Sequence, residues 1–229
     1  MILSHKYKYI FIKSFKTAST SLEIALSKYC GKEDVITPII NEDEKIRKIN
    51  GFNGPQNFGD TNIFHEHMSA LEIKSNVSKE IWDNYFKFVV VRNPFDQIMS
   101  AFHWHNKSKE KEKKLIFFKK RKKKFEDFFK IKAHHIFEDE YNRYTENDNV
   151  LVDQFIKYEN LKKDLVQLSQ KLNFPENIYE TFNNIHAKSN IRPGNSMIEV
   201  NNEVNNEVNN EINDKIKALA KKIIKLHNY

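Results

Sequence analysis

The apolar residues of this chain change their spacing from segment to segment, and each change predicts an element. Residues 7–15 (YKYIFIKSF) are aromatic and β-branched over a short run, which predicts a strand. From Thr20 the apolar positions follow a helical period. Thr20 with Glu23 fits a capping box, and Gly31 supplies a C-terminal stop. The chain is therefore expected to open as strand, loop and helix.

A second unit of the same kind follows further along the chain. Residues 86–91 (FKFVVV) form an uninterrupted apolar run, which is typical of a strand buried on both faces in a parallel sheet. Arg92 ends the run, and Asn93 can cap a helix whose first residue is Pro94. The buried side of this helix is expected to carry Ile98, Met99 and Phe102.

The remaining segments complete an alternation of strands and helices. Residues 41–62 hold three of the five glycines and predict a long irregular loop. Residues 63–74 begin in an extended pattern and become helical after Ser69, and residues 150–156 predict another strand with a helix after it. A closing amphipathic helix is expected over residues 215–226, with Ile216, Leu219, Ala220 and Ile223 on its buried side. This alternation predicts an α/β fold with a central, mainly parallel sheet.

Length and charge narrow the class of protein. The 229 residues predict a single domain. The net charge of +7 is local, because residues 107–132 (the basic segment) hold 13 Lys/Arg and 4 Asp/Glu. The apolar residues inside the basic segment predict an amphipathic helix. Residues 199–211 repeat EVNN as a low-complexity tract.

Cys30 is the only cysteine, which excludes an intramolecular disulfide and a zinc site built from several thiolates. The first residues show neither a signal peptide nor an apolar stretch long enough to span a membrane. A cytoplasmic location is therefore expected.

The segment between the first strand and helix combines small residues with hydroxyls and one cation. Free N–H groups at a helix N-terminus favour an anion, and Lys16 adds a positive charge. The hydroxyls could instead simply cap the helix. The pattern differs from the nucleoside-triphosphate loop, because G-x-x-x-x-G-K-[ST] is absent and the strand at residues 86–91 lacks a terminal Asp for Mg²⁺. The candidate phosphate-binding residues are Lys16, Thr17, Ala18, Ser19, Thr20 and Ser21.

Arg92 and Ser100 belong to the second strand–helix unit. A guanidinium and a hydroxyl at the same sheet edge could bind a further phosphate. The alternative is a structural ion pair of Arg92. Two anion-competent units in one sheet favour a ligand with two phosphate groups.

These two motifs resemble those of sulfotransferases. Residues 16–21 are similar to the loop that holds the 5′-phosphosulfate of 3′-phosphoadenosine 5′-phosphosulfate (PAPS) in that family, and residues 92–100 resemble its 3′-phosphate motif. The likeness is closest to the carbohydrate-type and bacterial branch. It implies a three-layer α/β sandwich like that of P-loop NTPases, with PAPS as donor and 3′,5′-ADP as product. By the same resemblance, Lys188 and Arg192, on a predicted loop, could contact the donor's 3′-phosphate or the acceptor.

The resemblance implies that Lys16 stabilises the bridging oxygen as the sulfuryl group leaves, so that no metal is required. His65 and His67 alternate, so an extended strand would place both side chains on one side. The pattern is similar to a His-x-His stretch of glycan uronyl sulfotransferases. We therefore expect His67 to be the general base with His65 in support, and a saccharide hydroxyl as the acceptor.

Two alternatives remain open on the sequence. His65 and His67 could bind a metal if a further ligand came from elsewhere in the chain. The protein could also be a non-catalytic nucleotide- or nucleic-acid-binding protein that uses the basic segment. Charge runs are more often solvated faces, so nucleic acid is not the expected partner.

Overall fold

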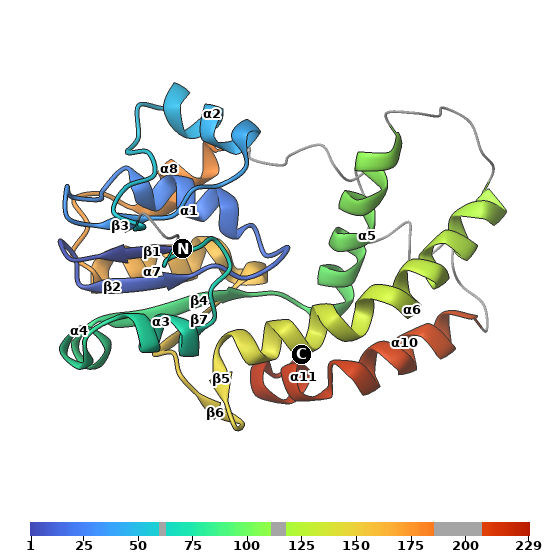
Figure 1. The fold of residues 1–229 in the computed structure, drawn as a ribbon. Coiled ribbons are helices and arrows are strands. Elements are labelled where there is room, and N and C mark those ends of the chain that lie inside the picture. The colour runs from blue at the N-terminus through green and yellow to red at the C-terminus, as the bar shows by residue number, and fades with distance from the viewer. Residues whose placement is uncertain (60–62, 111–117, 186–207) are drawn as a thin grey trace. The chain divides into compact units, whose positions relative to one another are not determined.

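The computed structural model describes residues 1–59, 63–110, 118–185 and 208–229 (Figure 1). The chain divides into two compact units. One unit comprises Met1–Val91 with Asn142–Lys188, and the other comprises Arg92–Tyr141 with Ser189–Tyr229. The single domain expected from the sequence stays a prediction.

The first unit is built on a five-stranded sheet of order β3-β1-β2-β4-β7. β1 pairs antiparallel with both β2 and β3, whereas β2 with β4 and β4 with β7 are parallel. The sheet is therefore mixed, and the parallel arrangement expected from the sequence holds for β2, β4 and β7. The strands are β1 Ile2–Ser4, β2 Tyr9–Ile12, β3 Val35–Ile36, β4 Phe86–Val91 and β7 Gln154–Lys157.

Both faces of the central strands are buried. Alternate residues of a strand point to opposite faces, and Phe11 and Phe88 are neighbours in the parallel register of β2 and β4. The face that carries them packs on α1 (Ser19–Ser27), α7 (Leu161–Lys171) and α8 (Ile178–Asn183), and Figure 1 shows α1 and α8 along that side of the sheet. On the other face Ile10, Ile12, Val89 and Val91 are buried as well. This two-sided burial confirms the α/β class; the P-loop-like three-layer sandwich stays a prediction.

Several expected boundaries were wrong near the N-terminus. The strand predicted over residues 7–15 is only β2, because Lys8 adopts φ 53° in the turn from β1. β1 was not foreseen. α1 ends at Ser27, four residues before the predicted stop at Gly31.

The irregular loop predicted over residues 41–62 was wrong for its first half. The helix α2 (Asn41–Ile49) lies there, with three acidic residues in its first turn and basic residues in its last. That charge order suits the helix dipole. Residues 60–62 lie outside the described part of the chain.

The second half of the first unit follows the predictions more closely. Ser69 caps α3 (Ala70–Asn76) through a capping box with Glu72. The helix α4 (Lys79–Asn84) leads into β4. The strand expected at residues 150–156 is divided between β6 (Asn149–Val150), which pairs with β5 (Thr145–Glu146), and β7; the 3-10 helix η1 (Tyr158–Asn160) then precedes α7.

The second unit is helical: α5 Pro94–Glu110, α6 Phe118–Arg143 (whose last two residues belong to the first unit), α10 Val208–Leu219 and α11 Lys221–His227. Pro94 begins α5 as predicted, and the Asn93 side chain accepts a hydrogen bond from the Phe95 N–H at 3.0 Å. The Phe102 ring meets Phe125 and Phe128 edge-on, with centroids 5.1 and 5.5 Å away.

Of the closing helix's predicted apolar side, Ile216, Ala220 and Ile223 are buried. Leu219 is 42% exposed, because α10 ends there and the chain turns into α11. The basic segment runs through the end of α5 and the start of α6, apart from residues 111–117 outside the described chain. Along the described residues, no helix combines the length and apolarity of a membrane span.

Candidate functional site

The loop between β2 and α1 turns without glycine. Lys16 and Ala18 both adopt left-handed backbone conformations, with φ 60° and 64°. Each such residue costs about 1–2 kcal/mol relative to a right-handed one, so the surrounding structure must hold it. Left-handed residues in a turn are typical of the backbone concavities that bind anions. The loop therefore has the local form of an anion cradle, with the half-buried Lys16 at its centre.

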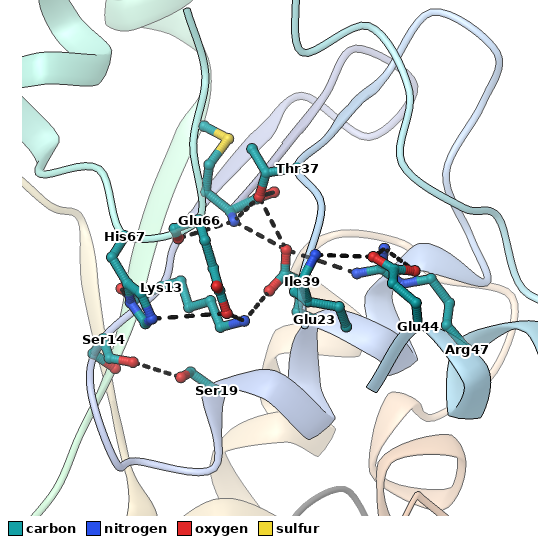
Figure 2. A network of polar contacts seen from close by, with 11 residues as sticks. Lys13, Ser14, Ser19, Glu23, Thr37, Ile39, Glu44, Arg47, Glu66 and His67 are labelled. Atoms are coloured by element: carbon teal, nitrogen blue, oxygen red, sulfur yellow. Dashed lines mark hydrogen bonds and ion pairs between the residues drawn. The ribbon is translucent and has the colours of Figure 1, made fainter. Parts of the chain in front are cut away.

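Hydroxyl groups fix this loop from within (Figure 2). The Ser14 Oγ donates to the Val90 carbonyl at 2.5 Å and lies 2.5 Å from the Thr17 Oγ1. Since the carbonyl can only accept, the Thr17 hydroxyl donates to Ser14. The Ser19 Oγ donates to the Ser14 carbonyl at 2.6 Å. The side chains of Thr17 and Ser19 therefore hold the loop in shape.

The helix start itself corrects a prediction. α1 begins at Ser19, and its N-cap residue is Ala18, whose methyl group cannot accept a cap hydrogen bond. The capping box of Thr20 with Glu23 was therefore wrong. The hydroxyls of Thr17 and Ser19 instead form hydrogen bonds within the loop. Thr20 and Ser21 occupy the first turn of α1 and are buried.

A buried ion-pair network lies beside the loop (Figure 2). The fully buried Lys13 ammonium is 2.6 Å from Glu23 Oε2 and also contacts Glu66 Oε1. Glu23 in turn accepts from the Thr37 hydroxyl at 3.2 Å and lies 3.8 Å from the Arg47 guanidinium. It also accepts from the amino group of Met1 at 3.0 Å.

Charge decides the ionisation of Glu23. Burial by itself raises the pKa of its carboxyl, but the positive charges of Lys13, the amino terminus and Arg47 outweigh burial and lower the pKa to about 2. Glu23, on α1, is therefore ionised at neutral pH and pairs with Lys13, which follows β2, and with Arg47 on α2. This role of Glu23 was not predicted, because its sequence position fitted a helix cap.

His67 touches the network directly. Its Nδ1 lies 3.2 Å from the Lys13 carbonyl oxygen, which can only accept, so Nδ1 carries the proton and Nε2 holds the lone pair. Burial, followed by the charge of Lys13, lowers the pKa of His67 to about 4. The side chain is still 38% exposed. His67 is therefore a neutral imidazole at pH 7, with a proton-accepting nitrogen and access to solvent.

His65 does not share this position. Residues 65–68 form a turn in which the Met68 N–H donates to the His65 carbonyl at 3.4 Å, so the extended alternation expected from the sequence was wrong. The His65 side chain is exposed, with Nε2 3.8 Å from Glu72 Oε1 at the start of α3. Instead, the residue near the His67 ring is Glu66, whose Oε1 lies 3.7 Å from Nε2 of His67. Glu66 was missed; its place between the two histidines was the available signal.

The second predicted motif lies in the other unit. Arg92 follows β4 directly in the chain, and β4 is the parallel neighbour of β2, the strand that leads to Lys16. The Arg92 guanidinium pairs with the Asp96 carboxylate one turn along α5, and both side chains are buried. This is the ion pair that the sequence left open as the alternative. Ser100 lies on α5 and is half-buried.

Other candidates can be placed only in part. Lys188 and Arg192 lie outside the described residues. Within the described chain, no three His, Cys, Asp or Glu side chains gather in the manner of metal ligands.

Comparison with known proteins matches the chain to a protein family. A family model described as "Sulfotransferase family" matches residues 1–229. A protein of Archaeoglobus fulgidus, described as an uncharacterized protein, is 28% identical over 117 residues that cover 48% of this chain and 87% of the relative. No solved structure matches the chain.

Proposed function

Because the chain belongs to the sulfotransferase family, we propose that it moves a sulfuryl group from PAPS to an acceptor hydroxyl and releases 3′,5′-ADP. The observation that carries the proposal is the β2–α1 loop. It combines two left-handed residues, a lysine and a helix start whose N-cap residue is an alanine. Such a loop suits a dianionic phosphosulfate.

Donor binding is divided between the two predicted motifs. The backbone N–H groups of residues 16–21 and the Lys16 ammonium hold the 5′-phosphosulfate. Arg92, with Ser100, holds the 3′-phosphate. The ion pair with Asp96 supports this role, because it fixes the guanidinium while the fork geometry of Arg provides several donors. By family resemblance, Lys188 and Arg192 are also assigned to donor binding.

The transfer step needs one group that stabilises the leaving phosphate and another that accepts the proton of the acceptor hydroxyl. The acceptor oxygen attacks sulfur, the bond from sulfur to the bridging oxygen breaks, and its electron pair stays on the 5′-phosphate. Lys16 stabilises the charge that develops on that bridging oxygen. The acceptor proton passes to Nε2 of His67, which is neutral at pH 7 because the pKa of the imidazole is lowered to about 4.

Donor specificity is checked by thermal unfolding. The desulfonated product 3′,5′-ADP is expected to stabilise the protein, by about 2.7 kcal/mol at a hundred times its dissociation constant. Nucleotides that lack the 3′-phosphate should stabilise it less. Stabilisation by ATP without any by 3′,5′-ADP would point to phosphoryl chemistry and overturn the proposal.

The base assignment has its own test. His67→Asn keeps a polar side chain of similar reach but cannot take up a proton, so kcat is expected to fall about 10²- to 10⁴-fold. His65→Asn is the matched control: the His65 side chain is exposed and lies near Glu72, so this variant should retain near-full activity. Equal losses in the two variants would remove His67 from the base role.

The pH dependence follows from the same group. A base must be unprotonated, so kcat/KM should rise with pH through about 4 and stay level up to neutrality. The acidic limb should disappear in His67→Asn. A limb near pH 6.5 would contradict the low pKa of His67.

The acceptor class rests on family resemblance, and we propose a saccharide hydroxyl. Incubation with ³⁵S-labelled PAPS and a panel of saccharides, phenols and sterols tests it. Label entering saccharides first would support the proposal, whereas transfer to phenols alone would replace it.

A further inference from the structure

Glu66 joins the candidate base to the buried cation. Its Oε1 contacts the Lys13 ammonium and lies 3.7 Å from Nε2 of His67. The Lys13 backbone carbonyl meanwhile accepts from Nδ1 of the same imidazole at 3.2 Å. Figure 2 shows Lys13 between Glu66 and Glu23, with His67 on the Glu66 side. One residue therefore fixes the ring through its carbonyl and holds the neighbouring carboxylate through its ammonium.

The charged groups around His67 differ in sign and in their partners. Lys13 is fully buried, and Glu23 is its second carboxylate partner, so Lys13 stays paired whatever happens at Glu66. Arg143 contributes another positive charge near His67 and donates to the His67 backbone carbonyl. Among the groups that act on the imidazole, Glu66 supplies the negative charge that favours its protonated form.

We propose that Glu66 is a positioning residue for the transfer reaction: its carboxylate, held by Lys13, stabilises the imidazolium that forms on His67 when the acceptor hydroxyl gives up its proton. The inference rests on the proposed function. In the resting state Nε2 carries a lone pair and gains little from the carboxylate. Once the proton arrives, the 3.7 Å separation joins opposite charges in a partly buried site. The interaction is thus strongest where charge develops.

The contact with Lys13 also explains why Glu66 acts on His67 and does not itself take the proton from the acceptor. The Glu66 oxygen nearest to the imidazole is the same Oε1 that contacts the ammonium. A carboxylate held this way has a fixed position, which suits an electrostatic partner better than a group that must take up the acceptor proton itself.

The test is Glu66→Gln, an isosteric change that removes the charge while Glu23 keeps Lys13 paired. By NMR titration, the proton affinity of the His67 ring should fall about tenfold. In steady-state assays kcat should fall about 10- to 100-fold, a part of the usual general-base contribution, with KM for PAPS unchanged. Glu66→Asp should recover part of both. The matched control is Glu72→Gln, which keeps the capping box with Ser69 and faces the exposed His65.

Three results would overturn the inference. An unchanged His67 titration in Glu66→Gln would mean that the carboxylate does not act on the ring. An activity loss as large as that of His67→Asn, with the titration unchanged, would make Glu66 the base. A raised KM for PAPS at constant kcat would assign Glu66 to donor binding. If the protein transferred no sulfuryl group at all, the titration would still report the coupling, so failure of the proposed function is distinguishable.

Discussion

Replacing Lys16 with alanine is expected to lower kcat for sulfuryl transfer from PAPS by about a hundredfold to a thousandfold. The ammonium lies in the loop that follows β2, where it would meet the negative charge developing on the leaving phosphate. Alanine and lysine bear similar strain at φ 60°, so the fold should persist. Single-turnover assays with ³⁵S-labelled PAPS measure the loss, and circular dichroism checks the fold.

The chain offers a matched control for this variant. Lys8 is also a lysine at positive φ, 53°, but it lies in the β1–β2 turn and is exposed. Lys8→Ala should leave kcat within a factor of about two. Equal activity in the two variants would exclude Lys16 from the chemical step.

Replacing Glu23 with glutamine is expected to destabilise the fold by about 3–5 kcal/mol at pH 7. Lys13 and Arg47 are buried cations, and without the Glu23 carboxylate each keeps only a partly exposed partner, Glu66 and Glu44 respectively. Urea unfolding measures the change. The control is Glu176→Gln, which removes an exposed partner of Lys28 and should cost under about 1 kcal/mol. A Glu23→Gln effect no larger than that control would show that the network contributes little.

The same carboxylate gives the wild-type protein an acid-sensitive stability. Because the pKa of Glu23 is lowered from 4.5 to about 2 in the fold, its contribution is fully present above about pH 4.5 and is lost as pH falls through 2. The difference amounts to about 3 kcal/mol. Unfolding curves between pH 7 and pH 2 should show this slope in the wild type, and a smaller slope in Glu23→Gln.

The sequence predicted those helices and strands that are determined by residues within the element itself. The run FKFVVV predicted β4, because a short, β-branched apolar run is typical of a strand buried on both faces. Pro94 marked the start of α5, and Ser69 marked that of α3, since each residue acts within its own first turn.

The misses depended on partners distant in the sequence. Glu23 fitted a capping pattern, but its charge is taken by Lys13 and Arg47, which no short window reveals. The His65 and His67 alternation fitted a strand, yet the segment turns and sends His65 toward Glu72. For the candidate site, the loop around Lys16 was therefore predictable from local chemistry, whereas the surroundings of His67, including Glu66, required the tertiary structure.

The most direct test of sulfuryl transfer by this chain is a single-turnover reaction with ³⁵S-labelled PAPS and a mixed saccharide acceptor, followed by separation of the products. The proposed function predicts that label appears in the acceptor as an equal amount of 3′,5′-ADP is released, and that Lys16→Ala slows both together. Intact PAPS after long incubation with wild-type protein, alongside stabilisation by ATP and none by 3′,5′-ADP, would contradict it.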